Sequence, residues 1–204
     1  MGLLRRYSTP LVYLGAYGAM SVVYLHALSP RDREGLVAWA STNLDNLPDN
    51  PVGTMVVSAF VAEGSQAGLF VVGALGLFPV ARRFGNSRAL LLISLGHVVG
   101  TLVSQGVAAW RLELGELPES VRTASDVGPS YVISAALVAA ILYGPGRLAR
   151  LGALAGYLAA APSLFEGLTS LEIGALGHVV AMLTGGAVGG AFVLAERRRA
   201  APGS

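Results

Sequence analysis

Six long apolar runs extend along this chain of 204 residues and restrict what it can fold into. They cover residues 10–28, 55–79, 89–110, 127–144, 149–164 and 171–195. Each is close to the roughly 20 residues that a helix needs to cross the hydrocarbon core of a bilayer. Charged residues make up only 13% of the chain, against about 25% in soluble domains. The sequence therefore predicts an all-α, polytopic membrane protein, with one domain of six transmembrane helices over residues 1–204.

The arginines predict the direction of the spans, because cytoplasmic connections of membrane proteins carry an excess of positive charge. One set of connections holds ten arginines and a single acid, Glu196, whereas the other set holds four arginines and eleven acids. The ten are Arg5, Arg6, Arg82, Arg83, Arg88, Arg147, Arg150, Arg197, Arg198 and Arg199. Six spans with both termini in the cytoplasm satisfy the rule throughout, and the expected location is the plasma membrane of a bacterial cell.

Composition excludes several classes of function. The chain has no cysteine, which rules out disulfides, thiol chemistry and iron–sulfur clusters. Its three histidines form no metal-binding tract, and we expect neither a metal nor a cofactor. The arginines lie beside apolar runs, so the basic charge indicates membrane topology and not nucleic-acid binding. The expected partners are the lipid bilayer and transmembrane proteins. Residues 29–53 form a long external loop, in which charged residues mixed with Trp39 favour an amphipathic element in the membrane interface.

A serine and a histidine fall at similar depth in two parallel spans of this topology. The fourth span enters from outside near Ser125, which places Ser130 about 6–8 Å below the outer end at 1.5 Å per residue. The sixth span places His178 roughly 10 Å below the same end. A hydroxyl with a base within hydrogen-bond reach is the minimum for an activated nucleophile. Either residue alone is also common as a packing or buried polar residue of a membrane helix.

The motifs around these two residues resemble those of the rhomboid intramembrane proteases, a six-helix family with a Gly-x-Ser-Gly serine at the start of the fourth helix and a partner histidine in the sixth. VGPSY (127–131) matches the serine motif except that Tyr131 replaces the second glycine. GHVVAMLTGG (177–186) matches the sixth helix at His178 and Gly185, and residues 51–70 are similar to the start of the second. The resemblance implies that Ser130 attacks a peptide bond of a membrane-embedded substrate, with His178 as its base.

The sequence departs from this family where the oxyanion is held. Rhomboids carry a histidine and an asparagine in the second helix, and the matching positions fall near Gln66 or Ala67, and at Phe70, which cannot donate a hydrogen bond. Losing one oxyanion donor costs roughly 10²- to 10³-fold in rate. Gln66 and the backbone N–H of Ser130 are the remaining candidates.

Two further residues beside the serine are expected to support the site. One is Gly128 of the serine motif. The other is Asp126, whose first interpretation is the N-cap of the fourth helix and whose alternative is a residue that tunes the site.

The glycines of the sixth span predict close helix packing. GGAVGG (185–190) contains two overlapping Gly-xxx-Gly pairs, one of which is Gly185 with Gly189. In rhomboids, close packing of the fourth and sixth helices brings the serine and the histidine together.

Two other functions stay open. One is a catalytically inactive, rhomboid-like binder of membrane proteins, which Phe70 and Tyr131 favour. The other is a small transporter, which is favoured only by LGHVV at 95–99 and again at 176–180, a possible trace of an inverted repeat. His97, within the first LGHVV, is predicted to lie near mid-membrane, well below the site, as a buried polar contact.

Overall fold

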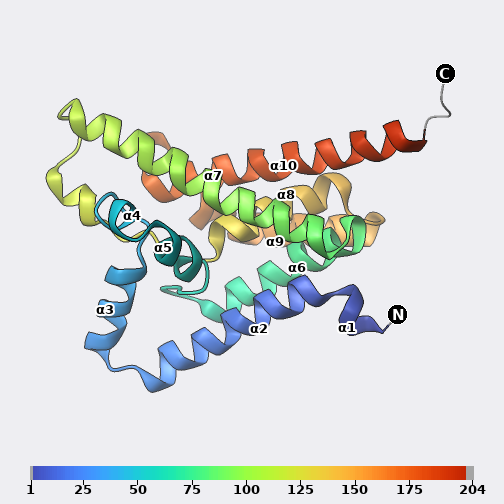
Figure 1. Ribbon diagram of the computed structural model, residues 1–204, viewed down its shortest axis with the longest axis horizontal. Coiled ribbons are helices and arrows are strands. Elements are labelled where there is room, and N and C mark those ends of the chain that lie inside the picture. Colours follow the sequence, from blue (N-terminus) through green and yellow to red (C-terminus); the bar gives the residue numbers. More distant parts are fainter. Residues whose placement is uncertain (1, 201–204) are drawn as a thin grey trace.

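The computed structural model describes residues 2–200, which form an all-helical bundle with no strand (Figure 1). The longer helices are α2 (Ser8–Val22), α3 (Pro30–Ala40), α6 (Gln66–Phe84), α7 (Asn86–Glu113), α8 (Ser130–Tyr143), α9 (Arg147–Leu164) and α10 (Ile173–Ala200). The shorter elements are α1 (Leu3–Arg6), α4 (Asn46–Asp49), α5 (Pro51–Ser58), a π-helical turn η1 (Val23–Ala27) that continues α2, and two 3₁₀ turns, η2 (Glu119–Thr123) and η3 (Leu168–Ser170).

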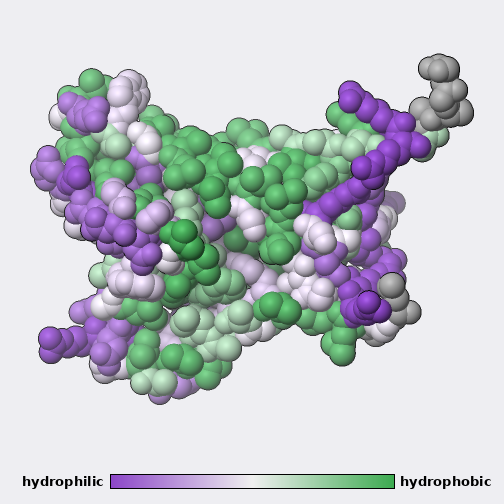
Figure 2. Space-filling view, viewed as in Figure 1, coloured by the Kyte–Doolittle hydropathy of each residue, from purple (hydrophilic) through white to green (hydrophobic). Residues whose placement is uncertain are grey.

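Several of these helices suit a membrane bundle. By length and composition α6, α7 and α10 can each cross a bilayer, and α8 is a shorter apolar helix. Figure 2 shows hydrophobic residues across the middle of the visible face and hydrophilic residues gathered at its left and right ends. The all-helical class and the membrane character of the chain are therefore confirmed, while the number of spans and the orientation of the termini stay predictions.

The prediction of one uninterrupted span over residues 55–79 is wrong. Helix α5 ends at Ser58, residues 59–65 are not helical, and α6 begins at Gln66. Gly64 lies in this break with φ of 85°, a left-handed conformation that favours glycine. Ala59, Val61 and Ala62 of the break are buried, and Val61 packs in a cluster with Val37 and Ala40 of α3. Their hydropathy predicts that these residues face lipid, but other parts of the protein cover them.

Helix α8 is the centre of the bundle and packs against α6, α7, α9 and α10. Most of its residues are buried, including two pairs of adjacent alanines, Ala135–Ala136 and Ala139–Ala140, whose small side chains allow neighbouring helices to come close. Ala135 lies where three helices meet. A Cβ on Gly96 of α7 would overlap the Ala135 methyl, and a Cβ on Gly185 of α10 would overlap the Ala135 carbonyl. The two glycines therefore let α7 and α10 approach α8 at van der Waals distance.

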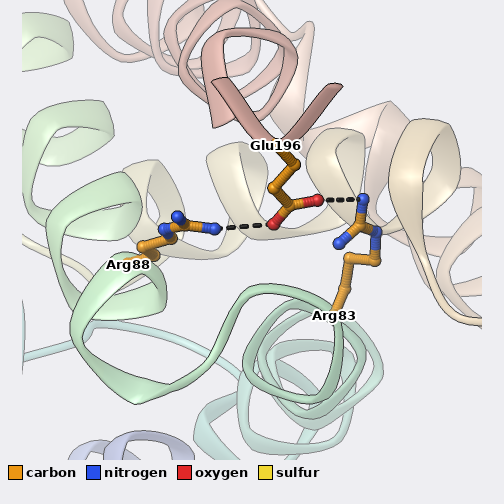
Figure 3. Close-up of polar contacts among 3 residues, drawn as sticks. All are labelled: Arg83, Arg88 and Glu196. Carbon is orange, nitrogen blue, oxygen red and sulfur yellow. Dashed lines mark hydrogen bonds and ion pairs between the residues drawn. The ribbon is translucent and has the colours of Figure 1, made fainter. Parts of the chain in front are cut away.

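Ion pairs tie together three helix ends at one end of the bundle (Figure 3). Arg83 near the end of α6 donates to Glu196 of α10 at 2.8 Å, and Arg88 near the start of α7 donates to the other carboxylate oxygen at 2.6 Å. Helix α1 and the last turns of α10 lie at this same end in Figure 1. The arginine-rich connections on α6, α7 and α10 thus share one side of the molecule, which agrees with the grouping that the charges predicted.

The Glu196 cluster is expected to make stability depend on pH. The hydrogen bond from Arg83, together with the charges of Arg83 and Arg88, holds the pKa of the Glu196 carboxyl below its ordinary value. Because this pKa is lower in the folded protein than in the unfolded chain, the stabilisation is present above the ordinary carboxyl pKa and is lost as the pH falls through the lowered value.

Replacement of this carboxylate isolates its contribution. Since the carboxylate is about one-third exposed and screened by solvent, we expect Glu196→Gln to lower the free energy of unfolding by only about 0.5–1 kcal/mol at neutral pH. Unfolding in detergent measures this difference, which should shrink as the pH is lowered from about 5 to about 2. Glu119→Gln is the control, because Glu119 is an exposed carboxylate of η2 outside this cluster. A difference that stays constant with pH would contradict the assignment.

Candidate functional site

A cavity of about 520 Å³ lies beside the starts of α6, α8 and α10 and the end of α9. Glycine, alanine and other small or apolar residues make up most of its wall. The polar residues that line it are Glu63, Ser65, Ser130, Ser163 and His178. Both residues of the predicted catalytic pair therefore contact the same cavity, although they come from different helices and lie 48 positions apart in the sequence.

Ser130 is the first residue of α8 and is half-buried. Pro129 precedes it and supplies no N–H, which costs little at a helix start. Gly128 has φ of 141°, where glycine is favoured, and its N–H donates to the carbonyl of Ser58 at 2.8 Å. The Gly-Pro-Ser turn is thus fastened to the end of α5. Since this bond occupies the Gly128 N–H, Gly128 holds the turn through its backbone and also lines the cavity.

His178 lies in the second turn of α10, buried and with one nitrogen held by the backbone. Its Nδ1 is 2.9 Å from the carbonyl oxygen of Leu164 at the end of α9. A carbonyl can only accept, so Nδ1 carries the hydrogen, and a neutral imidazole then has a lone pair on Nε2. Nε2 is shielded from solvent and has no hydrogen-bond partner among the described residues. One nitrogen is therefore oriented and the other is free to accept a proton.

Ser130 and His178 are not hydrogen-bonded to each other within residues 2–200. Hydrogen bonds between a nucleophile and its base are often long until a substrate fills the site. The geometry brings the two residues to one cavity without a direct bond between them.

The structure does not bring Gln66 to this cavity. Gln66 and Phe70 line a different cavity, of about 330 Å³, between α2 and α6, and Gln66 Nε2 donates to the Ala62 carbonyl at 3.1 Å. The α6 residues at the Ser130 cavity are Gly68, Leu69 and Val72. Positions 66 and 70 share one face of the helix, and positions 68 and 72 another. The sequence alignment thus had the wrong helical phase, and the helix wall at the site carries no side-chain donor.

Asp126 is not the N-cap of α8, and its interpretation as a cap is wrong. Helix α8 has no side-chain cap, and the residue at its N-cap position is Pro129. The Asp126 carboxylate instead accepts hydrogen bonds from Thr42, Gln105 and Tyr131. Asp126 precedes the first residue of α8 by four positions, which is too far along the chain for it to cap the helix. Its side chain instead contacts α7, α8 and the segment between α3 and α4.

His97 lies nearer to the site than predicted. Its ring centroid is 6.1 Å from that of Tyr131, which lies 5.2 Å from that of His178, so the tyrosine ring separates the two histidines. His97 Nε2 contacts the Met55 carbonyl at 2.8 Å and so joins α7 to α5. In each LGHVV segment the glycine packs on α8, Gly96 against Ala135 and Gly177 against the Tyr131 ring. Close packing on both sides of one central helix gives the repeat a structural explanation.

Gly185 and Gly189 lie on the face of α10 that contacts α8. Gly185 packs on the backbone of Ala135, and a Cβ on Gly189 would lie 2.6 Å from the Tyr143 ring. The two helices run side by side along this seam, with Ser130 and His178 at one end of it. No group of three histidine, aspartate or glutamate side chains close enough to hold a metal ion occurs in the part of the chain that the structure describes.

A family model described as rhomboid-like protein matches residues 3–198, nearly the whole chain. No curated protein and no solved structure gives a significant match.

Proposed function

The chain belongs to the rhomboid-like family, and on that premise we propose that it is an intramembrane serine protease with Ser130 as nucleophile and His178 as base. One observation carries the proposal: the two side chains line the same cavity, and the histidine has an oriented Nδ1–H and a free Nε2. Nucleophile, base and a group that orients the base are the recurring parts of serine hydrolases.

The proposed reaction uses residues of this chain alone. Nε2 of His178 takes the proton of the Ser130 hydroxyl as Oγ attacks the carbonyl carbon of a peptide bond, and the Leu164 carbonyl stabilises the resulting imidazolium through Nδ1–H. The histidine then gives this proton to the leaving amine, and water hydrolyses the acyl-enzyme. The N–H of Ser130 is among the first of α8, which have no partner inside the helix, so it is the donor proposed for the oxyanion.

The position of the cavity supports a proposal for the substrate class. It is at the end of the bundle away from the arginine-rich connections, beside helices that suit a bilayer. We propose that substrates are transmembrane proteins, cut close to the outer surface of the plasma membrane. The arginine distribution supports this sidedness, with both chain termini in the cytoplasm.

Cleavage in a bilayer tests the proposal. The full-length protein and its Ser130→Ala variant are reconstituted in liposomes with a panel of single-span reporter proteins. We expect at least one reporter to be cut by the wild type and none by Ser130→Ala. Ser134→Ala is the matched control, because Ser134 lies one turn further along α8 and is fully buried away from the cavity wall. Equal cleavage by wild type and Ser130→Ala would contradict the proposal.

A second candidate is a binder of membrane proteins that does not cut them. The wall formed by Gly68, Leu69 and Val72 favours it, because this face of α6 lacks a side-chain donor for an oxyanion. The absence of one such donor lowers rates by roughly 10²- to 10³-fold in serine hydrolases. Reporters that crosslink to the cavity in both the wild type and Ser130→Ala, without cleavage by either, would favour this function.

A further inference from the structure

Asp126 joins several parts of the molecule. Its Oδ2 accepts from Thr42 Oγ1 at 3.1 Å and from Gln105 Nε2 at 3.0 Å, and its Oδ1 accepts from the Tyr131 hydroxyl at 3.0 Å. Its backbone carbonyl accepts from the Thr42 N–H at 3.0 Å, and its own N–H donates to Ser41 Oγ at 3.3 Å. The residue thus connects the segment between α3 and α4 with α7 and α8. Contacts from three separate segments of the chain therefore hold the Asp126 carboxylate in a fixed position.

Tyr131 extends these contacts to His178. The tyrosine side chain is 4% exposed, and its ring meets the His178 ring edge to face, with centroids 5.2 Å apart. Its hydroxyl is also 3.3 Å from the carbonyl of Ile173, the first residue of α10. Gly177 makes room for the ring, because a Cβ there would overlap it. The tyrosine is therefore confined between Asp126 and the first two turns of α10.

The imidazole of His178 is then held from two directions. The Leu164 carbonyl binds Nδ1, which sets the tautomer, and the Tyr131 ring packs against the imidazole. A tilt of the imidazole toward Tyr131 is opposed as long as the tyrosine cannot move, and the Asp126 bond prevents that movement. A base must be held within a few tenths of an ångström and 10–20° of its productive geometry to act efficiently.

We propose that Asp126 is a positioning residue, which holds the imidazole of His178 in one orientation through Tyr131 and couples the Ser41–Thr42 segment to that orientation. The inference rests on the proposed function, in which Nε2 of His178 takes the proton of Ser130. Neither Asp126 nor Tyr131 touches the reacting atoms in this role. The Asp126 carboxylate restricts the movement of Tyr131, and the Tyr131 ring in turn restricts the tilt of the His178 imidazole.

The test compares two variants that each remove one donor to the same carboxylate. Tyr131→Phe keeps the ring and removes the hydroxyl that reaches Asp126, whereas Gln105→Leu removes a different donor and leaves the hydrogen bonds from Tyr131 and Thr42. The full-length protein, labelled with ¹⁵N-histidine in detergent micelles, is studied by NMR, and the His178 signals are identified by their loss in His178→Gln. We expect a single Nδ1–H tautomer for the wild type and for Gln105→Leu, and a mixture of tautomers for Tyr131→Phe.

A second measurement is the rate at which Ser130 reacts with a fluorophosphonate. We expect Tyr131→Phe to lower this rate by about 10- to 100-fold, as a small misplacement of a catalytic group does. Asp126→Asn should keep most of the wild-type rate, because its amide oxygen can still accept from Tyr131, whereas Asp126→Leu should behave like Tyr131→Phe. A residue needed only for folding would lower the stability of Gln105→Leu and Tyr131→Phe alike and leave the His178 signals unchanged.

An unchanged His178 spectrum in both Tyr131→Phe and Asp126→Leu would overturn the inference. The proposed function can fail separately from this inference. If the wild type does not react with the fluorophosphonate while Tyr131→Phe still alters the His178 tautomers, the positioning role of Asp126 is supported and the proposed protease activity is contradicted.

Discussion

Gly185→Ala is expected to lower the free energy of unfolding by about 2 kcal/mol, although alanine is the better helix former by about 1 kcal/mol. The added methyl would overlap the carbonyl and Cα of Ala135, and backbone cannot move aside as a flexible side chain can. Helices α8 and α10 must therefore separate, which removes contacts along the whole seam. The same separation would move His178 away from Ser130, so reactivity should fall together with stability.

The neighbouring glycine provides the control for this prediction. A Cβ on Gly186 would lie 3.5 Å from Leu142 and 3.7 Å from Val138, which are ordinary contacts with side chains. Gly186→Ala should therefore be neutral or slightly stabilising. Detergent-to-SDS unfolding of the two variants, in parallel with the wild type, gives the comparison. Equal stability of Gly185→Ala and Gly186→Ala would mean that the seam is less tightly packed than described.

His178→Gln is expected to lower the rate at which Ser130 reacts with a fluorophosphonate by about 10³-fold or more, with little change in stability. Glutamine is close to histidine in size and can still donate to the Leu164 carbonyl, but its amide cannot take a proton. General-base catalysis contributes about 10²- to 10⁴-fold in enzymes of this kind. The second-order rate constant of labelling measures the effect.

His26→Gln is the control for the loss of an imidazole as such. His26 is exposed, lies in η1 and does not line the Ser130 cavity, so its replacement should leave both the stability and the labelling rate close to those of the wild type. A loss of less than tenfold in His178→Gln would indicate that another group takes the proton.

The sequence was sufficient to predict the helical class, the membrane character and the residues that meet at the cavity. Hydropathy identifies apolar helices directly, and the distances of Ser130 and His178 from the ends of their runs gave their depth. The glycines at 185 and 189 indicated a close approach because small residues are the usual means of bringing membrane helices together.

The remaining features depend on which face of a helix meets which neighbour. The break at residues 59–65 escaped prediction because hydropathy does not distinguish apolar residues that the protein covers, such as Ala59 and Val61, from residues that face lipid. Gln66 and Phe70 were placed at the site because a short alignment cannot fix helical phase, and the residues at the cavity are Gly68, Leu69 and Val72. The role of Asp126 depends on Thr42 and Gln105, which are distant in sequence, and a cap was the only local explanation.

The proposed activity and the packing of the bundle depend on the same contacts. Helix α8 carries Ser130 at its start and Ala135 in its middle, and the glycines of α7 and α10 close around it. The helix that carries Ser130 is thus held in place by close contacts with α7 and α10, and a catalytic geometry needs rigid elements of this kind. The α6 wall lacks a side-chain donor for an oxyanion, so slow turnover is expected if the chain is a protease, and the same wall is what favours the binding function.

The most direct test of the central claim is to locate a covalent adduct. The full-length protein in liposomes is treated with a fluorophosphonate, and the modified peptide is identified by mass spectrometry. We predict one adduct per chain, on Ser130, that is absent from Ser130→Ala and nearly absent from His178→Gln. An adduct on another residue, or none on a folded wild-type protein, would contradict an activated serine at this position and leave the binding function as the better account.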